Sequence, residues 1–297
     1  MNRLKAWFVS GAGTLALGLS VHAGYMLATT DASLTWGGAL LATAAFNLQM
    51  AIILSRISPR TSANLPVTMG TAALGLALTV AGSFVEGASI MAITYAVLGV
   101  AMMALYVFWY SRLGRGHSEA LVEGSRLPAL SFEDASGNAI TTEELRAGGP
   151  LLLMFYRGNW CPLCNAQIRE LAERYRELKE RGVTVAFISP QSHENTKSIA
   201  ARFDVPAHFL VDVEHRSAKR LGIVHAGGLP AGMDALGYEQ DTVYPTVVIT
   251  DQDGVILFSD ETDNYRVRPE PDMFIAVLDG KDPRTAAPAA PAAAPAT

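Results

Sequence analysis

Four long stretches without a charged side chain constrain this chain more than any other feature. They contain no Asp, Glu, Lys or Arg and cover Ala6–Thr30, Ala32–Ser55, Thr61–Val85 and Gly87–Ser111. A helix of about 20 apolar residues crosses the hydrocarbon core of a bilayer, so each stretch is long enough to span it. The sequence therefore predicts an all-α transmembrane four-helix bundle over residues 1–111. A signal peptide is the alternative for the first stretch, although three further candidate spans follow it directly.

Charge is unevenly distributed along the 297 residues. Up to Arg115 the chain has six basic and two acidic residues, whereas from Gly116 onward 17 basic and 26 acidic residues give a net charge of −9. This contrast predicts two parts in different solvents, lipid and water. The acidic second part argues against nucleic acid as a partner, because phosphate binding needs clustered Lys and Arg. Residues 281–297 are almost all Ala and Pro and are expected to form a disordered tail.

Basic residues flank alternate ends of the predicted spans. They precede the first span, separate the second from the third and follow the fourth: Arg3, Lys5, Arg56, Arg60, Arg112 and Arg115. Because Lys and Arg are enriched in cytoplasmic loops, this pattern places both termini in the cytoplasm. The sequence thus predicts a four-span protein of the bacterial inner (cytoplasmic) membrane. Its second part, after a linker at residues 112–126, is expected to face the cytoplasm.

Small residues recur every four positions in two of the spans. These seams are Ala12, Ala16, Ser20, Gly24 and Ala28 in the first span, and Thr71, Gly75, Thr79, Ser83 and Gly87 in the third. Such seams let helices approach closely in lipid, which predicts an intramolecular bundle, with a homodimer interface as the alternative. Asn47 and Gln49 are interpreted as hydrogen-bonding groups between helices, with contact to a quinone or a lipid as the alternative.

Strand and helix patterns alternate in the second part. Leu151–Tyr156 is a continuous apolar run that predicts a buried central strand, and Pro162–Arg181 carries apolar residues at helical spacing. Pro245–Thr250 and Val255–Ser259 flank an Asp-Gln-Asp-Gly turn, which indicates a hairpin. Alternating strands and helices closed by a hairpin predict an α/β sheet with helices on both faces over residues 127–280.

Cys161 and Cys164 are the only cysteines, and both follow the spans, so the bundle has no thiol with which to relay electrons. A structural disulfide is disfavoured in a reducing compartment, and a metal site would need two more ligands than the scattered histidines supply. A Cys-x-x-Cys pair at a strand–helix junction instead indicates redox chemistry, without a cofactor or a metal. Pro162 suits the first position of a helix, which puts Cys161 at the helix N-terminus, where a thiolate is favoured. Cys161 is then the attacking thiol and Cys164 the resolving one.

Two further positions extend the candidate site. Arg157 precedes the cysteines and is expected to add positive charge beside them. Tyr244-Pro245 opens a predicted strand far along the chain. A trans proline is tolerated at the first residue of a strand, whereas a cis proline would place backbone beside the thiols for contact with a substrate. Both conformations stay open at this point.

Residues 155–164, Phe-Tyr-Arg-Gly-Asn-Trp-Cys-Pro-Leu-Cys, resemble the signature of peroxiredoxin-like proteins of the alkyl hydroperoxide reductase/thiol-specific antioxidant (AhpC/TSA) family. The resemblance covers Leu127–Leu278 and includes Thr246–Gly254 and the segment from Asp263 to Pro271. It implies a thioredoxin fold with Pro245 as its cis proline. It also implies that Cys161 reduces a hydroperoxide and that a thioredoxin- or glutaredoxin-like donor reduces the resulting disulfide.

The chain departs from the family pattern at two places. Typical members carry Thr or Ser three residues before the reactive cysteine, where this chain has Gly158, and an arginine on a late strand, which Val255–Ser259 lacks. Arg157 and Arg266 are the candidates for the role of that arginine. The Cys-x-x-Cys spacing is also typical of thioredoxin-type reductases.

We therefore expect a membrane-anchored thiol enzyme that reduces hydroperoxides. The alternatives are a thiol–disulfide oxidoreductase that acts on protein disulfides and a redox-sensing membrane module. The expected catalytic residues are Cys161, Cys164 and Arg157, and the expected substrate contacts are Trp160, Gly158, Tyr244 and Pro245.

Overall fold

The computed structural model describes residues 2–55, 58–203 and 205–283 and divides into two compact units. The first unit runs to Gly114 and also includes two later segments, Gly227–Tyr238 and Asn264–Val267. The second unit comprises the described residues of Arg115–Ala226, Glu239–Asp263 and 268–283. The chain is thus not divided at a single linker, because two short segments of its C-terminal half pack with the helices of the first unit. Most of the Ala/Pro tail predicted at residues 281–297 lies outside the described residues.

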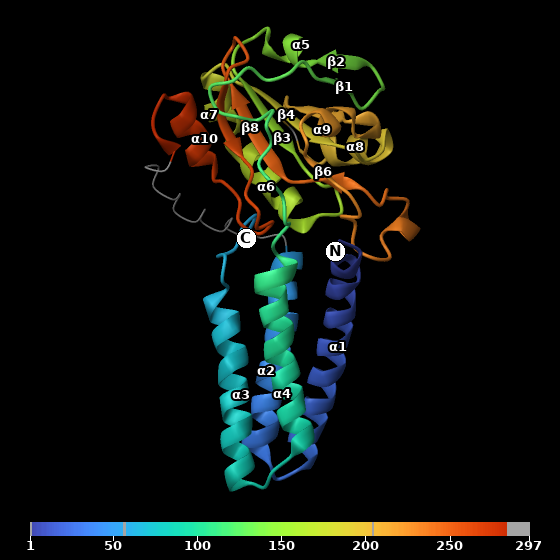
Figure 1. The fold of residues 1–297 in the computed structure, drawn as a ribbon, viewed down its shortest axis with the longest axis vertical. Helices are drawn as coiled ribbons and strands as arrows, with labels where there is room; N and C mark the ends of the chain where they lie inside the picture. Colours follow the sequence, from blue (N-terminus) through green and yellow to red (C-terminus); the bar gives the residue numbers. More distant parts are fainter. Residues whose placement is uncertain (1, 56–57, 204, 284–297) are drawn as a thin grey trace. The chain divides into compact units, whose positions relative to one another are not determined.

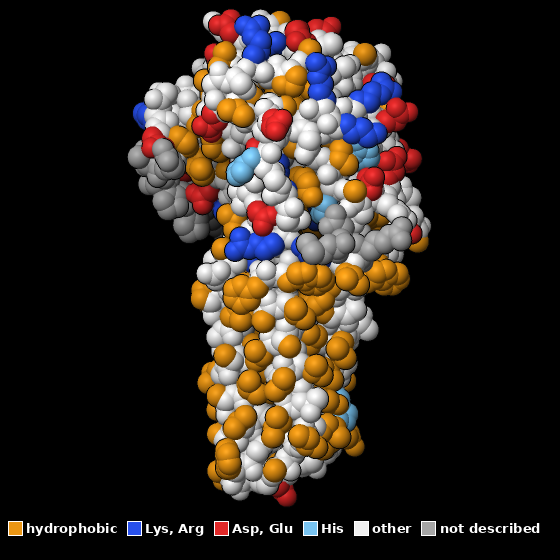
Figure 2. All heavy atoms as spheres, viewed as in Figure 1, with side chains coloured by type: hydrophobic (Ala, Val, Ile, Leu, Met, Phe, Trp, Pro, Cys, Tyr) orange, Lys and Arg blue, Asp and Glu red, His pale blue; other side chains and the backbone are white. Residues whose placement is uncertain are grey.

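The first unit contains four long helices (Figure 1). These are α1 (Asn2–Thr29), α2 (Ser33–Leu54), α3 (Pro66–Val85) and α4 (Ile90–Leu105), the last continued by the π-helical turn η1 (Tyr106–Tyr110). By length and composition all four, the fourth taken with η1, are able to cross a membrane. Figure 2 shows hydrophobic side chains over the visible surface of these helices.

The third and fourth helices begin later than predicted. Pro66 takes the first helical position of α3, so the residues from Thr61 to Leu65 stay outside the helix. The side chain of Ser89 accepts a hydrogen bond from the backbone N–H of Ala92 and so caps the start of α4. Proline and capping residues mark these boundaries, whereas the predicted ones followed the limits of the charge-free stretches.

The small residues of the third span pack against α2 within the same bundle. A Cβ atom on Gly75 would lie 2.4 Å from the backbone nitrogen of Ala42, and one on Gly38 would lie 2.5 Å from that of Thr79. The two backbones therefore touch, as the predicted intramolecular seam requires. Asn47 and Gln49 make hydrogen bonds between helices, which confirms the structural interpretation: their partners are Ser20 at 3.2 Å and Thr68 at 3.1 Å.

Arg266 joins the returning segment Asn264–Val267 to one end of the bundle. Its guanidinium is fully buried and donates to the Ser111 hydroxyl at 2.7 Å, the Thr61 hydroxyl at 2.7 Å and the Ser62 and Ala63 carbonyls at 2.9 Å each. The expectation that Arg266 serves the thiol site is therefore wrong, because its donors bind groups of the first unit.

The second unit is built on a seven-stranded sheet with the order β2-β1-β5-β4-β3-β8-β9. Its strands are β1 (Ser131–Glu133), β2 (Ala139–Thr141), β3 (Leu151–Phe155), β4 (Thr184–Ser189), β5 (His208–Val211), β8 (Thr246–Thr250) and β9 (Ile256–Asp260). Strands β3, β4 and β5 are parallel, whereas β8 runs antiparallel to β3 and forms the predicted hairpin with β9. Strands β6 (Val224–His225) and β7 (Thr242–Val243) pair separately.

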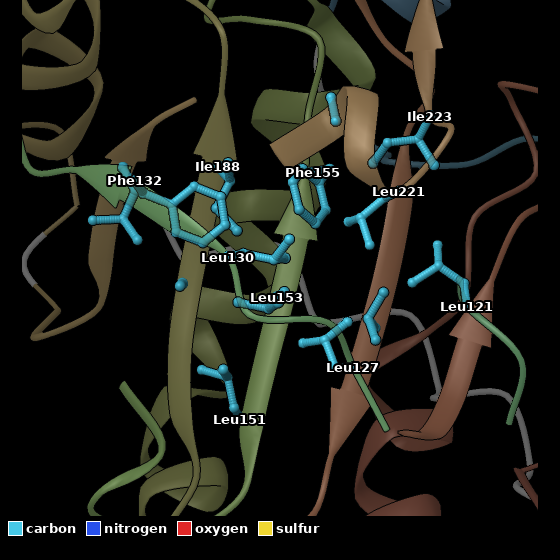
Figure 3. Packing of buried hydrophobic residues seen from close by; sticks show 14 of the residues in the cluster. Leu121, Leu127, Leu130, Phe132, Leu151, Leu153, Phe155, Ile188, Leu221 and Ile223 are labelled. Atoms are coloured by element: carbon cyan, nitrogen blue, oxygen red, sulfur yellow. The ribbon is translucent and has the colours of Figure 1, made fainter. Parts of the chain in front are cut away.

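Helices cover both faces of this sheet, as predicted for a thioredoxin-like α/β domain. They are α5 (Thr142–Arg146), α6 (Pro162–Glu173), α7 (Tyr175–Glu180), α8 (His193–Ala200), α9 (Arg216–Arg220) and α10 (Pro271–Leu278), with short 3₁₀ turns η2 (Val213–His215) and η3 (Asp234–Leu236). On one face, Leu151, Leu153 and Phe155 pack with a cluster that includes Ala218 of α9 (Figure 3). On the other, Phe258 of β9 contacts Phe274 of α10. The predicted helix at 162–181 is interrupted at Arg174, whose ψ of 7° leaves the helical region.

Candidate active site

The two cysteines lie where β3 passes into α6. Cys161 precedes the helix with extended backbone angles, and Pro162 occupies the first helical position, as predicted. The backbone N–H of Cys164 points back and donates to the Cys161 sulfur at 3.4 Å. The cysteine side chain thus takes the place of the oxygen that usually caps a helix. This arrangement follows from a buried strand, a tight loop and a helix-starting proline in succession.

Three polar side chains hold the loop before Cys161. The side-chain oxygen of Gln191 accepts the Asn159 N–H at 2.8 Å, and Asn165 donates to the carbonyls of Asn159 and Cys161 at 2.7 and 2.9 Å. The Thr242 hydroxyl donates to the Arg157 carbonyl at 2.8 Å. All three side chains are buried, so these hydrogen bonds fix the loop without competition from water. The sequence did not identify Gln191, Asn165 or Thr242 as site residues.

Arg268 is the charged group next to the thiols that sequence reasoning missed. Its guanidinium is buried, lies 3.9 Å from the Cys164 sulfur and also donates to the Gln167 side chain at 3.5 Å. Arg268 is two residues beyond Arg266, yet it belongs to the second unit. The charge of Arg157 also lowers the pKa of both cysteines, as predicted, so Arg157 and Arg268 both add positive charge beside the pair.

The two buried thiols have pKa values shifted in opposite directions. Burial raises the pKa of the Cys161 thiol well above its ordinary value, and its hydrogen bond to Cys164 raises it further. Burial also acts to raise the pKa of Cys164, but the hydrogen bond from Cys161 and the charge of Arg268 lower it to about 6. The two shifts belong to one coupled pair in which the sulfurs share a proton, so the Cys161 thiolate expected from the sequence stays a prediction.

Gly158 is fitted to the side chain of Trp160. Its φ of 146° lies in the region that favours glycine, and a Cβ atom there would lie 2.5 Å from the indole nitrogen of Trp160. The indole ring in turn faces the Arg157 guanidinium at 4.8 Å. A Thr or Ser at position 158 would therefore overlap the indole, which explains the glycine at this place. Arg157, Gly158 and Trp160 thus lie with the cysteines in one loop, as predicted.

Gly158→Ala should lower the free energy of unfolding by about 1–3 kcal/mol, since it adds a positive-φ side chain and a clash with Trp160. Denaturant titration of the full-length protein measures the loss. Gly148→Ala is the matched control, because a Cβ atom there meets nothing within 4 Å. A second variant that adds Trp160→Ala should recover part of the loss by removing the clash. Equal stability of Gly158→Ala and Gly148→Ala would contradict this explanation of the glycine.

Tyr244 and Pro245 contact other residues of the second unit, and their predicted contact with a substrate stays a prediction. The Pro245 peptide is trans, since the described residues contain no cis peptide bond, so the implied cis proline is wrong. Pro245 directly precedes β8, where a missing N–H interrupts no pairing, and its carbonyl accepts from Arg115 at 3.0 Å. Tyr244 stacks on His225 with ring centroids 4.6 Å apart and lies against Arg115. Arg115 itself pairs with Glu261 at 3.0 Å.

The geometry supports thiol chemistry at the loop. Both cysteines are free and lie one helical turn apart. When one of them is oxidised, the other is therefore close enough to form a disulfide with it. Cys161 keeps an exposed fraction of 3%, whereas Cys164 is fully enclosed. Among the described residues, no group of three or more His, Cys, Asp or Glu side chains is placed to hold a metal ion.

Comparisons with known proteins agree with this chemistry. Residues 124–259 match the AhpC/TSA family. Peroxiredoxin Q from the chloroplast of Sedum lineare is 26% identical over 103 residues, which cover 35% of this chain and 55% of that protein. The thiol-disulfide oxidoreductase ResA of Bacillus subtilis is 29% identical over 114 residues, which cover 37% of this chain and 62% of that protein. The chain thus spans about half to three fifths of the length of these curated relatives.

Similar solved structures include two mycobacterial proteins. Peroxidoxin BcpB from Mycobacterium tuberculosis is 19% identical and aligns with a TM-score of 0.45 over 56% of this chain and 98% of that one. AhpC of the same organism is 18% identical, with a TM-score of 0.43 over 54% of this chain and 92% of that one.

Proposed function

We propose that this protein is a membrane-anchored thiol enzyme that reduces hydroperoxides through Cys161, with Cys164 as the resolving cysteine. The Cys161 thiolate attacks the O–O bond, which gives a sulfenic acid and, with one proton, releases an alcohol or water. The Cys164 thiol then displaces water from the sulfenic acid and forms the disulfide. A thioredoxin- or glutaredoxin-like dithiol returns both cysteines to the reduced state and is itself oxidised.

The observation that carries this proposal is the buried cysteine pair beside the Arg268 guanidinium. A cation next to the pair favours the thiolate that attacks a peroxide, and the shared proton lets the charge move between the sulfurs. Transfer of that proton from Cys161 to Cys164 puts the negative charge on Cys161, the less buried of the two cysteines. The hydrogen bond from the Cys164 N–H at 3.4 Å then stabilises the Cys161 thiolate. The match to the AhpC/TSA family supports the same chemistry.

Reduction of protein disulfides is the second candidate. Gly158 leaves no hydroxyl where typical peroxiredoxins orient the peroxide, and the Cys-x-x-Cys spacing suits disulfide exchange. Similarity to a thiol-disulfide oxidoreductase, ResA, favours this candidate as well.

Kinetics of the reduced full-length protein distinguish the two candidates. Stopped-flow mixing with hydrogen peroxide should change the fluorescence of Trp160, which lies in the cysteine loop, and thioredoxin with its reductase should then sustain peroxide consumption. If neither the fluorescence change nor peroxide consumption is seen and the protein reduces insulin disulfides, the protein is a disulfide reductase and the hydroperoxide proposal fails.

The anchorage is part of the same proposal. Four apolar helices support insertion in the bacterial inner membrane, and the basic flanks support a cytoplasmic redox unit. Ser136 is exposed and lies in the second unit. A cysteine placed there, in a Cys161→Ser/Cys164→Ser background, should react with an impermeant maleimide only after lysis of the cells. Labelling of intact cells would reverse the orientation.

A further inference from the structure

One connection of the C-terminal half returns to the start of the first span. Residues 227–238, between β6 and β7, belong to the first unit, and the Ala231 N–H donates to the Ala6 carbonyl at 3.0 Å. Ala6 lies in α1, whose apolar span begins at Leu4. This connection therefore contacts the N-terminal end of α1, a helix that the proposed function places in the membrane.

The same connection exposes an apolar side chain. Leu236, in η3, is 70% exposed, as much as Leu4 and nearly as much as Trp7, which are 70% and 72% exposed on α1. Outside the four spans, the other exposed large hydrophobic side chains of the described residues are Val122 at 55% and Leu257 at 40%. Within 227–238 there is one charged residue, Asp234. A weakly charged turn with an exposed leucine beside a span end has the character of an interfacial membrane segment.

The other end of the connection supports the cysteine loop. Six residues after Leu236, Thr242 donates its hydroxyl to the Arg157 carbonyl at 2.8 Å. Six residues extend over at most about 20 Å. The chain therefore joins the exposed leucine to the loop that carries Arg157 and the cysteines by a short tether.

From these contacts we propose that residues 227–238 lie at the lipid surface, with Leu236 in the acyl-chain boundary, and that the substrates are hydroperoxides of membrane lipids. The substrate class rests on the proposed hydroperoxide chemistry, whereas the lipid contact rests only on the proposed membrane anchorage. Cys161 would then take the distal oxygen of the lipid –OOH group and leave the lipid alcohol in the bilayer.

Site-directed spin labelling tests the lipid contact without any activity. A nitroxide is attached at Leu236→Cys in the Cys161→Ser/Cys164→Ser background, with the full-length protein in phosphatidylcholine nanodiscs. Val122→Cys, an exposed position of the second unit, is the control. Collisions with molecular oxygen, which dissolves in lipid, should exceed those with a water-soluble nickel chelate at position 236 and not at position 122. Equal access of the chelate to both positions would overturn the proposal.

Rates with two peroxides test the substrate class. In vesicles that contain phosphatidylcholine hydroperoxide, Leu236→Ser should lower the ratio of the lipid hydroperoxide rate to the hydrogen peroxide rate by about five-fold or more, because the interfacial anchor is lost. Val122→Ser should leave this ratio unchanged. An unchanged ratio in Leu236→Ser would overturn the assignment of lipid hydroperoxides. If the wild type consumes neither peroxide, the proposed hydroperoxide chemistry fails, and the nitroxide measurement alone decides the lipid contact.

Discussion

Cys161→Ser should lower the rate of peroxide consumption by at least about 10³-fold, because a serine hydroxyl is not ionised at neutral pH and cannot replace the attacking thiolate. Cys164→Ser should keep the first oxidation and lose turnover. That variant has no second thiol to share a proton with Cys161. The backbone N–H of residue 164 and the charges of Arg157 and Arg268 still favour the Cys161 thiolate.

The two variants are compared with the wild type by stopped flow and by trapping the sulfenic acid with dimedone. Cys164→Ser should form one dimedone adduct per chain at residue 161, and Cys161→Ser none. The opposite pKa shifts make this a demanding test, because the pKa of Cys161 is raised and that of Cys164 is lowered in the coupled pair. An adduct at Cys164 in the Cys161→Ser variant would show that Cys164 attacks the peroxide. The attacking and resolving roles in our mechanism would then be exchanged.

The sequence predicted the elements whose signal is local. The run Leu151–Tyr156 is apolar on both faces, the hairpin has its turn residues between two apolar strands, and α6 starts at a proline. Each of these signals depends on a few neighbouring residues. Strands β1 and β6 gave no signal, because they have only three and two residues, too few to show an alternating pattern.

The same distinction applies to the site. Gly158, Trp160 and both cysteines lie within seven consecutive positions, from the loop into the first turn of α6, so a motif was enough to find them. Arg268 contacts a sulfur 104 positions away. Nothing in the local sequence distinguishes it from Arg266, which lies two residues earlier and binds the first unit instead. The positive charge that Arg268 adds beside Cys164 depends on that long-range contact and could therefore not be predicted from the motif.

Arg268→Gln should raise the pKa of the thiol pair and slow the reaction at pH 7 by up to about 30-fold. Arg268 helps to lower the pKa of Cys164 to about 6. A positive charge favours the thiolate, so its loss moves the pKa upward toward the ordinary cysteine value of about 8.5. At pH 7 the thiolate fraction then falls from about nine tenths to a few hundredths, which sets the size of the effect.

The pH profile separates this charge effect from a packing defect. In the wild type the rate should rise as the pH passes through about 6 and then level off. In Arg268→Gln the rise should move to higher pH, and above pH of about 9 the two rates should converge. Arg268→Lys should restore most of the shift because it keeps the charge, and Arg169→Gln, an exposed position of α6, should follow the wild type. If Arg268→Gln is slower but its rate rises at the same pH as in the wild type, Arg268 stabilises the structure of the site and does not lower the pKa of the thiols.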